Sequence, residues 1–385
     1  MARNNSTVSE LYSSCRNNDI NEVKELVRKL PLDEIDRIEP NGSTALHVAS
    51  YYGHIEIVGL LLERGASRSI RNRHGYTPES ESKGIEIRRL FLRENESERF
   101  VCHGDEIEWM KVDENVHREA GKWRWIIEHS WEGRNLDWLV HEVQTDFINI
   151  DFKESRHLER IKKYFDEVID KKDPIYLITA YTAQTDFYSH LNKQLAIIGG
   201  NFKSANDNVN RCGMKCYLQI LFTHCAFDRM SYIGECYRGM KITQHDLGQY
   251  EVRSHIMNKA FLSTSFDYSV AKKFAIKHSE VNKQKFTAIC TYKIRNRRTA
   301  LSIMEISEYR HEKEVLIMPY TAFQVKSIRR NSNNQNNEPD FFIDLEESAP
   351  TSGLNEQNEA INTEKQLTLR KKFMRKFNKW LGNES

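Results

Sequence analysis

The sequence predicts a multidomain protein in which an all-α stack of repeats precedes an α+β domain of mainly antiparallel strands. Two observations predict this architecture. The first is a self-similarity at a spacing of 33 residues near the start of the chain, where Gly42 and Thr44 recur as Gly75 and Thr77. The second is a set of short strand segments, interleaved with amphipathic helical segments, between residues 173 and 330.

Length and composition limit the possible functions. The 385 residues are enough for two domains and a tail, and the formal net charge of +2 argues against a nucleic-acid partner. The sequence contains no apolar run of about 18 residues, so no transmembrane helix is expected. The N-terminus also lacks the apolar core of a secretory signal. Seven cysteines over this length are typical of reduced thiols, and we therefore expect a cytoplasmic protein.

The front of the chain resembles ankyrin repeats. The segment from Thr44 to Ala49 matches the Thr-Pro-Leu-His-x-Ala signature of that repeat, except that Ala45 replaces the proline. The segment 55–64 is predicted to be the second helix of the unit and to end at Gly65. We expect two to three stacked units over residues 8–94, with atypical units at both ends acting as caps.

The histidine of this signature, His47, has two interpretations. It looks like a catalytic residue out of context, but in this repeat a hydrogen bond that ties neighbouring turns together is the favoured interpretation. The resemblance implies a protein partner on the repeats and says nothing about chemistry.

Residues 96–172 contain five of the six tryptophans. Apolar side chains at helical spacing predict two helices, and Asp173-Pro174 is expected to end the second. We therefore expect a helical connector whose tryptophans pack in the core. An aromatic surface that binds a ligand is the alternative.

The first motif in the second half of the chain is Tyr237-Arg238-Gly239. A strand is predicted from Ser231 to Tyr237, directly before Arg238. Arg238 is expected at the end of this strand, where its guanidinium can donate two parallel hydrogen bonds to a pyrophosphate. Gly239 has no side chain and would let a ligand approach the backbone closely. Taken alone, the triplet is more simply a surface arginine at a turn.

The second motif is Ser263-Thr264-Ser265, on a short predicted strand that leads into a helix with Ala271 and Phe274 on its apolar face. Hydroxyl groups on a strand beside a cleft can orient a carboxylate or a ribose. Taken alone, the motif is more simply a helix N-cap with solvated serines.

The third motif is Glu312-Lys313-Glu314, followed by a buried strand from Val315 to Ile317. Two carboxylates two residues apart on an extended backbone point to the same face, roughly 6–7 Å apart. They repel each other unless a ligand or an acceptor group uses them. A solvated, charged strand end is the alternative.

The order and strand context of these motifs resemble the arginine-type mono-ADP-ribosyltransferases, whose signature is an Arg, a Ser-Thr-Ser and a Glu-x-Glu on three strands. The resemblance runs from about Asp173 to Arg329 and includes an entry segment, 175–191, followed by Asn192. It implies transfer of ADP-ribose from NAD to a reactive arginine of an acceptor protein, with release of nicotinamide. An NAD glycohydrolase and a catalytically inactive ankyrin scaffold remain alternatives.

The resemblance also implies the catalytic roles. Arg238 would hold the phosphate and ribose of NAD. Ser263 would orient Glu314, the catalytic carboxylate beside the bond that breaks. Glu312 would face the acceptor and confer the preference for arginine.

Further residues that the resemblance places around NAD are Tyr237, Gly239, Thr264, Ser265 and Phe274. NAD acts here as a substrate, and neither a Rossmann nor a phosphate-loop glycine motif is present to hold it. No metal is expected, because Cys212, Cys216, His224 and Cys225 are irregularly spaced for structural zinc.

The tail divides into two parts. Residues 331–363 are rich in Asn, Ser and Glu and are expected to form a disordered linker. Residues 364–382 are predicted to form a basic amphipathic helix, typical of contact with an anionic membrane or a calmodulin-like groove. A helix docked on the protein's own body is the alternative.

Overall fold

The computed structural model describes residues 8–93, 109–112, 116–198, 212–276, 285–331 and 338–348. The described residues up to Glu347 form one compact unit, and Ser348 belongs to a second. The predicted basic helix at 364–382 and the linker after residue 348 lie outside the described residues. No helix in the described ranges is long and apolar enough to cross a membrane.

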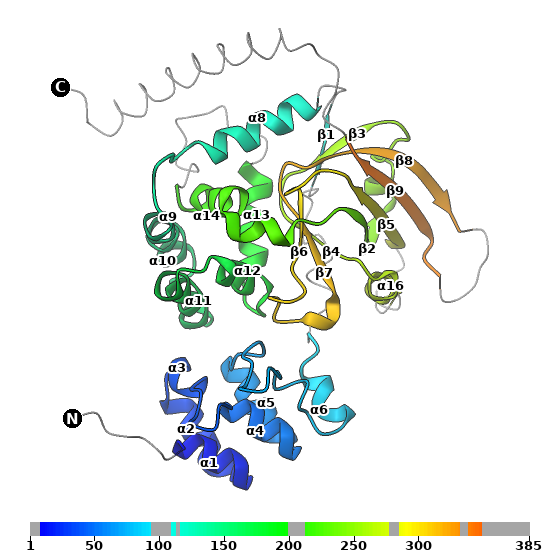
Figure 1. Ribbon diagram of the computed structural model, residues 1–385. Coiled ribbons are helices and arrows are strands. Elements are labelled where there is room, and N and C mark those ends of the chain that lie inside the picture. The colour runs from blue at the N-terminus through cyan, green and yellow to red at the C-terminus, as the bar shows by residue number, and fades with distance from the viewer. Residues whose placement is uncertain are drawn as a thin grey trace, which may run out of the picture. The chain divides into compact units, whose positions relative to one another are not determined.

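The front of the chain is an all-α stack of helix pairs, as predicted. Its elements are α1 (Glu10–Asn17), α2 (Ile20–Lys29), α3 (Leu32–Ile35), α4 (Ala45–Tyr52), α5 (Ile55–Arg64) and α6 (Ile85–Leu90), shown in Figure 1. α1 packs on α4 and α2 on α5, so each pair buries its apolar side against the next. The Gly65 cap is confirmed by its φ of 102°, a left-handed conformation that suits glycine.

His47 joins two neighbouring units of this stack. Its Nδ1 lies 2.8 Å from the hydroxyl of Thr44, and its Nε2 lies 3.0 Å from the carbonyl oxygen of Tyr76 in the next unit. Burial lowers the pKa of His47, which favours the neutral ring. The structural interpretation of this histidine is therefore confirmed.

The part of the chain that follows the repeats contains a nine-stranded sheet with the strand order β1-β3-β8-β9-β5-β2-β4-β7-β6. Every neighbouring pair is antiparallel except β5 with β9, which confirms the predicted fold class. The strands are β1 (Trp109–Val112), β2 (Gly234–Thr243), β3 (His255–Asn258), β4 (Leu262–Ser265), β5 (Lys285–Ile294), β6 (Ala300–Ser302), β7 (Glu314–Ile317), β8 (Ala322–Arg330) and β9 (Phe341–Glu347).

Helices cover the sheet on two sides. One group shares a single hydrophobic core with residues of β3, β6, β7 and β8, and Figure 1 shows α9–α14 gathered on one side of the sheet. α16, in contrast, packs on β2 and β5. The elements are α8 (Val116–Glu128), α9 (Leu136–Val143), η1 (Gln144–Ile148), α10 (Asn149–Asp151), α11 (Leu158–Lys171), α12 (Ile175–Thr182), α13 (Phe187–Ile198), α14 (Cys212–Thr223), η2 (Cys225–Met230), α15 (Gln244–Leu247) and α16 (Tyr268–Ile276).

The expected helical connector differs from the structure at one place. Trp109 to Val112 form strand β1, which pairs with β3 at one edge of the sheet. The prediction of a purely helical segment was wrong there, because four residues carry too little periodicity to identify a strand whose partner lies far along the chain. Core packing is confirmed for Trp109, and Trp123, Trp131 and Trp138 pack against the core.

The expected disordered linker also contains a strand. In β9, the buried Phe341, Ile343 and Leu345 alternate with half-buried residues, and the strand pairs with β5 on one side and β8 on the other. The prediction of disorder was therefore wrong for residues 341–347. The surrounding residues are rich in Asn and Glu and obscure this short alternating pattern. The strand conformation becomes favourable once the segment packs between two neighbouring strands.

Gly239 of β2 lies directly under α16. A Cβ at this position would overlap the carbonyl oxygen of Ala271 and lie 2.8 Å from the amide nitrogen of Ala275. The space beside this glycine is thus filled by the helix and is not left open for a ligand to approach.

We expect Gly239→Ala to lower the free energy of unfolding by about 1–3 kcal/mol, because α16 has to move away from the sheet. Urea denaturation followed by fluorescence measures the change. Gly121→Ala in α8, where an added Cβ meets no atom within 4 Å, is the matched control and should be neutral or stabilising. Equal effects of the two substitutions would contradict close packing of α16.

Candidate active site

The three predicted motifs lie on adjacent strands. β4 pairs with β2 on one side and with β7 on the other. Ser265 is the common partner, since it lies opposite Tyr237 of β2 and opposite Glu314 of β7. Residues that are far apart in the sequence are thereby brought to one place in the sheet.

Arg238 lies within β2 and not at its end. The strand pairs with β5 along its full length, from Gly234 to Thr243, so the predicted end near residue 237 was wrong. The guanidinium Nη1 of Arg238 donates a hydrogen bond of 2.9 Å to the carbonyl oxygen of Ser263. Arg238 is buried, and this bond fixes its head group at β4.

The Ser-Thr-Ser motif is buried on β4, so the solvated-serine alternative is excluded. The hydroxyl of Thr264 donates to the carbonyl oxygen of Val315 at 2.6 Å, and that of Ser265 donates to the carbonyl oxygen of Lys313 at 3.3 Å. Ser263 is on the same face as Ser265 and lies diagonally across from Glu314. Two hydroxyls of the motif therefore fasten the start of β7.

The two glutamates occupy different backbone conformations. Glu314 is the first residue of β7, whereas Glu312 ends the 3₁₀ turn η3 (Arg310–Glu312). The turn closes through a bond from the amide of Lys313 to the carbonyl of Arg310, at 3.0 Å, and leaves Lys313 at a φ of 48°. The prediction that both carboxylates lie on one extended strand was wrong, because Glu312 belongs to the turn and only Glu314 belongs to the strand.

Lys313, between the two glutamates, also anchors this turn. Its Nζ lies 2.8 Å from Oδ2 of Asp267, and this hydrogen bond lowers the pKa of Asp267. Its side chain is thus engaged at the start of α16, while its neighbours Glu312 and Glu314 are both buried.

Glu312 is in contact with an arginine, Arg93, that belongs to none of the three predicted motifs. Nε and Nη2 of Arg93 lie 2.9 and 3.3 Å from the two carboxylate oxygens of Glu312. The guanidinium carbon of Arg93 is 3.8 Å from the centre of the Tyr309 ring. No sequence motif contains Arg93, which simply follows the shortened last repeat, so local patterns offered no signal.

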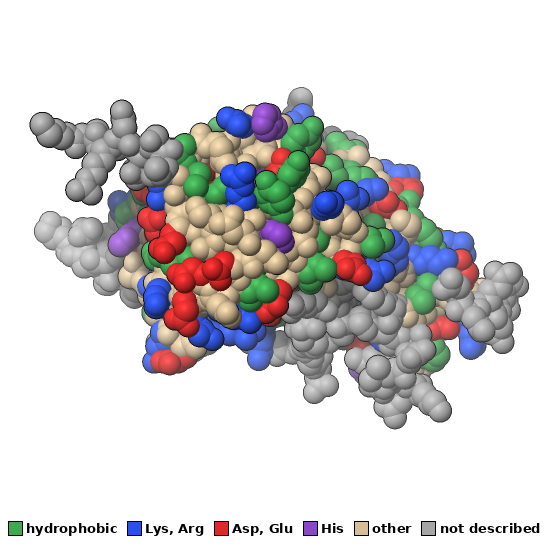
Figure 2. Space-filling view, turned by 90° about the horizontal axis from the view of Figure 1, so that it is seen from below, with side chains coloured by type: hydrophobic (Ala, Val, Ile, Leu, Met, Phe, Trp, Pro, Cys, Tyr) green, Lys and Arg blue, Asp and Glu red, His purple; other side chains and the backbone are tan. Residues whose placement is uncertain are grey.

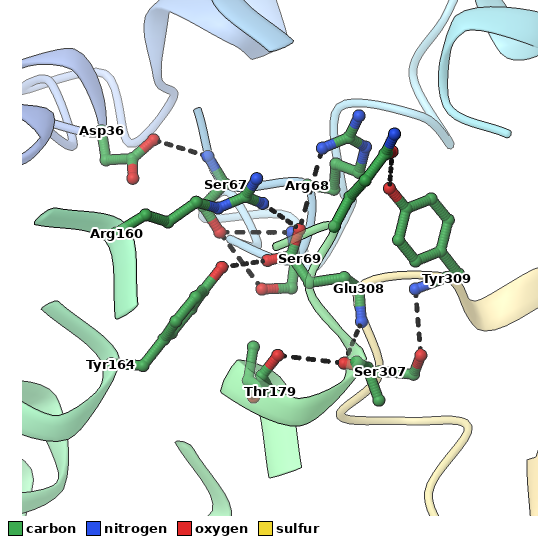
Figure 3. A network of polar contacts seen from close by, with 12 residues as sticks. Asp36, Ser67, Arg68, Ser69, Arg160, Tyr164, Thr179, Ser307, Glu308 and Tyr309 are labelled. Atoms are coloured by element: carbon green, nitrogen blue, oxygen red, sulfur yellow. Dashed lines mark hydrogen bonds and ion pairs between the residues drawn. The ribbon is translucent and has the colours of Figure 1, made fainter. Parts of the chain in front are cut away.

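The loop before β7 is held by a second buried carboxylate, that of Glu308. Tyr164 donates to it at 2.8 Å and Arg160 at 2.9 Å, both from α11, as Figure 3 shows. The amide of Glu308 in turn donates to the hydroxyl of Thr182 at 3.1 Å. No sequence pattern predicted this network, because its members come from separate elements.

The remaining predicted residues surround the three strands. The Tyr237 ring makes an edge contact with Tyr268 at 5.5 Å, and Phe274 is buried on α16. Asn192 of α13 donates to the hydroxyl of Tyr181 at 3.0 Å and to the carbonyl oxygen of Phe261 at 3.4 Å. It therefore ties the entry helices to the start of β4.

Side chains grouped as metal ligands are not seen in the described ranges, where no three His, Cys, Asp or Glu residues come together. Cys212 and Cys216 have their sulfur atoms 3.7 Å apart.

Comparison with known proteins identifies both parts of the chain. A family model described as NAD:arginine ADP-ribosyltransferase matches residues 137–352, which is more than half of the chain. A second model, of three ankyrin repeats, matches residues 3–78. The transferase match begins within the expected connector, so α10, α11 and all but the first residue of α9 fall inside the region that the family model covers.

Individual relatives match parts of the chain. A putative NAD(+)--arginine ADP-ribosyltransferase, Vis of Vibrio splendidus, is 31% identical over 103 residues, which are 27% of this chain and 41% of Vis. The human ankyrin repeat domain-containing protein 13B is 34% identical over 86 residues, 21% of this chain and 14% of that protein. The chain therefore spans less than half the length of these relatives.

Solved structures also match part of the chain. A crystal structure of Vis is 20% identical, and the match covers 60% of this chain and 93% of the chain in that crystal, with a TM-score of 0.35. The type III effector XopAI of Xanthomonas axonopodis pv. citri is 17% identical, covering 61% of this chain and 99% of that chain, with a TM-score of 0.39. With the family model over more than half of its length, this chain belongs to the NAD:arginine ADP-ribosyltransferase family and carries ankyrin repeats ahead of the transferase domain.

Proposed function

We propose that the protein transfers ADP-ribose from NAD to an arginine side chain of an acceptor protein. One observation carries the arginine preference. The Glu312 carboxylate binds a guanidinium through two nitrogens, with an aromatic ring against the guanidinium plane. This geometry suits a planar guanidinium fork much better than a lysine ammonium or a hydroxyl.

Arg238, Ser263 and Glu314 supply the NAD side of the proposed reaction. The bond between ribose and nicotinamide breaks through an oxocarbenium-like state, as in glycoside cleavage. Nicotinamide leaves as a neutral molecule, so it needs no general acid. The carboxylate of Glu314 would stabilise the developing ribosyl cation, Ser263 would orient that carboxylate, and Arg238 would hold the phosphate and ribose.

Glu312 supplies the acceptor side. A free arginine is protonated at neutral pH and is a poor nucleophile. The carboxylate of Glu312 would align the guanidinium and accept its proton as the new bond to ribose forms. The ring face of Tyr309 would stack against the guanidinium plane.

The ankyrin stack is the proposed site for the protein partner. Large apolar side chains are exposed at its helix ends, namely Tyr51, Tyr52, Ile55 and Ile85. Figure 2 shows exposed hydrophobic side chains between acidic, basic and histidine groups on the face seen from below. Aromatic side chains such as tyrosine are enriched in protein–protein interfaces. The repeats would thus select which acceptor is modified.

The cytoplasmic location and the role of the tail stay predictions. Six cysteines in the described part of the chain are free thiols, which suits a reducing compartment. The predicted contact of residues 364–382 with an anionic membrane or a calmodulin-like partner lies outside the described residues.

NAD glycohydrolysis is the second candidate function. One observation favours it: the carboxylate of Glu312 is engaged by Arg93, while Glu314 belongs to the ribose side of the proposed mechanism. With the acceptor position filled, water would be the remaining nucleophile. The same residues would then release free ADP-ribose.

Incubation of the purified full-length chain with labelled NAD and agmatine, a small guanidine, separates the candidates. The transferase would form ADP-ribosyl-agmatine, and the glycohydrolase would form only free ADP-ribose. Formation of neither product at any NAD concentration would leave a binding scaffold and overturn both enzymatic functions.

We expect Glu314→Gln to reduce both nicotinamide release and transfer to agmatine by at least ~10²-fold, because it removes the charge that stabilises the ribosyl cation. Chromatographic assay of nicotinamide measures the effect. Glu305→Gln, at an exposed carboxylate on the same loop, is the matched control and should retain activity. A similar loss in both variants would point to a general disturbance of the loop.

We expect Glu312→Gln to reduce transfer to agmatine at least ~10²-fold while NAD hydrolysis falls much less, because only the acceptor loses its general base. The ratio of ADP-ribosyl-agmatine to free ADP-ribose is the measured quantity. Thermal unfolding of the variant serves as a check, since Arg93 loses its buried carboxylate partner. An unchanged product ratio would contradict the acceptor role of Glu312.

A further inference from the structure

Arg93 is bound as a guanidinium ligand would be bound. Its Nε and Nη2 meet the two oxygens of Glu312, and Nη2 also donates a 3.0 Å hydrogen bond to the carbonyl oxygen of Thr182. The Tyr309 ring lies against the guanidinium at 3.8 Å. A carboxylate, a carbonyl and an aromatic face together recognise the charge, the donors and the flat shape of this group.

The contact is closed to solvent. The side chains of Arg93 and Glu312 are each 3% exposed. Burial alone would lower the pKa of Arg93, but the charge and hydrogen bonds of Glu312 outweigh it and raise the pKa. The guanidinium is therefore charged and fully engaged, and no second guanidinium can reach the Glu312 carboxylate while Arg93 remains there.

The repeat stack supplies this arginine. Arg93 follows α6, the last repeat helix, by only a few residues. Other arginines of the stack contact the same loop, since Arg71 pairs with Glu305 at 3.1 Å and Arg68 lies 4.0 Å from Glu308. The position of Arg93 is thus linked to how the stack sits on the loop that carries Glu312.

We propose that Arg93 is an internal occupant of the acceptor site, which an incoming guanidinium has to displace before transfer. The inference rests on the proposed function, in which Glu312 receives the acceptor arginine. The subsite consists of the Glu312 carboxylate, the Tyr309 ring and the Thr182 carbonyl. A partner that shifts the stack would withdraw Arg93 and open the site.

A purely structural ion pair is the competing explanation. A buried ion pair contributes little net stability compared with apolar packing, so stability alone is a weak reason for this contact. The two explanations differ in one measurable respect. Only an occupant of the acceptor site competes with an added guanidine, whereas a structural anchor leaves guanidine binding unchanged.

The first test compares Arg93→Gln with Arg71→Gln in the full-length chain. Both variants remove an ion pair between the stack and the loop, but only the first touches Glu312. Removing an internal competitor raises the fraction of competent protein, so Arg93→Gln should lower the KM for agmatine at least about fivefold. The KM for NAD should stay unchanged in both. Equal KM values for agmatine in the two variants would overturn the proposal.

Calorimetric titration of agmatine without NAD separates this inference from the proposed function. Tighter binding to Arg93→Gln than to wild type, abolished in Arg93→Gln/Glu312→Gln, supports the subsite even if no transfer is catalysed. Equal binding to both proteins, or binding to neither, rejects the internal occupant. Absent transfer with intact binding would count against the proposed reaction alone.

Hydrogen exchange on the wild-type chain covers the case in which Arg93→Gln does not fold. Saturating agmatine should raise exchange in residues 85–93, because the displaced arginine releases the end of the stack. Urea at the same concentration is the control for a non-specific effect of a small polar solute. Unchanged exchange in this segment at saturating agmatine would overturn the proposal.

Discussion

The site depends on the position of β4 between β2 and β7. β4 is the middle one of three antiparallel strands, so its pairing sets the register of both β2 and β7. A slip by one residue would turn every side chain to the opposite face. Ser265 is paired with Tyr237 and Glu314 at the same time. The hydroxyl of Thr264 adds a hydrogen bond from β4 to β7, and the guanidinium of Arg238 adds one from β2 to β4. The three motifs are therefore brought onto adjacent strands by backbone pairing, before any ligand contributes.

The loop before β7 connects this sheet to the ankyrin stack. It carries two buried carboxylates, Glu308 and Glu312, and each meets arginine. Arg160 comes from the helical body, whereas Arg93 comes from the end of the stack. A buried carboxylate without its partner is costly, so the loop, the helices and the stack stabilise one another.

Much of the architecture was predictable because it is encoded locally. The repeat signature, the Gly65 cap and the role of His47 follow from spacing within one or two turns. The predictions failed where partners decide the outcome. β9 forms because β5 and β8 flank it, and Glu312 leaves the extended backbone because the Lys313 turn closes against α16 and β4.

The sequence by itself determined the two kinds of domain and the three motifs that carry the family resemblance, because each is a short pattern read within a few residues. Tertiary structure decided that these motifs lie on adjacent strands, and that Arg93 meets Glu312. The latter pair is separated by 219 positions in the chain. No local propensity links residues so far apart, and only the packing of the stack against the transferase domain brings their charges into contact.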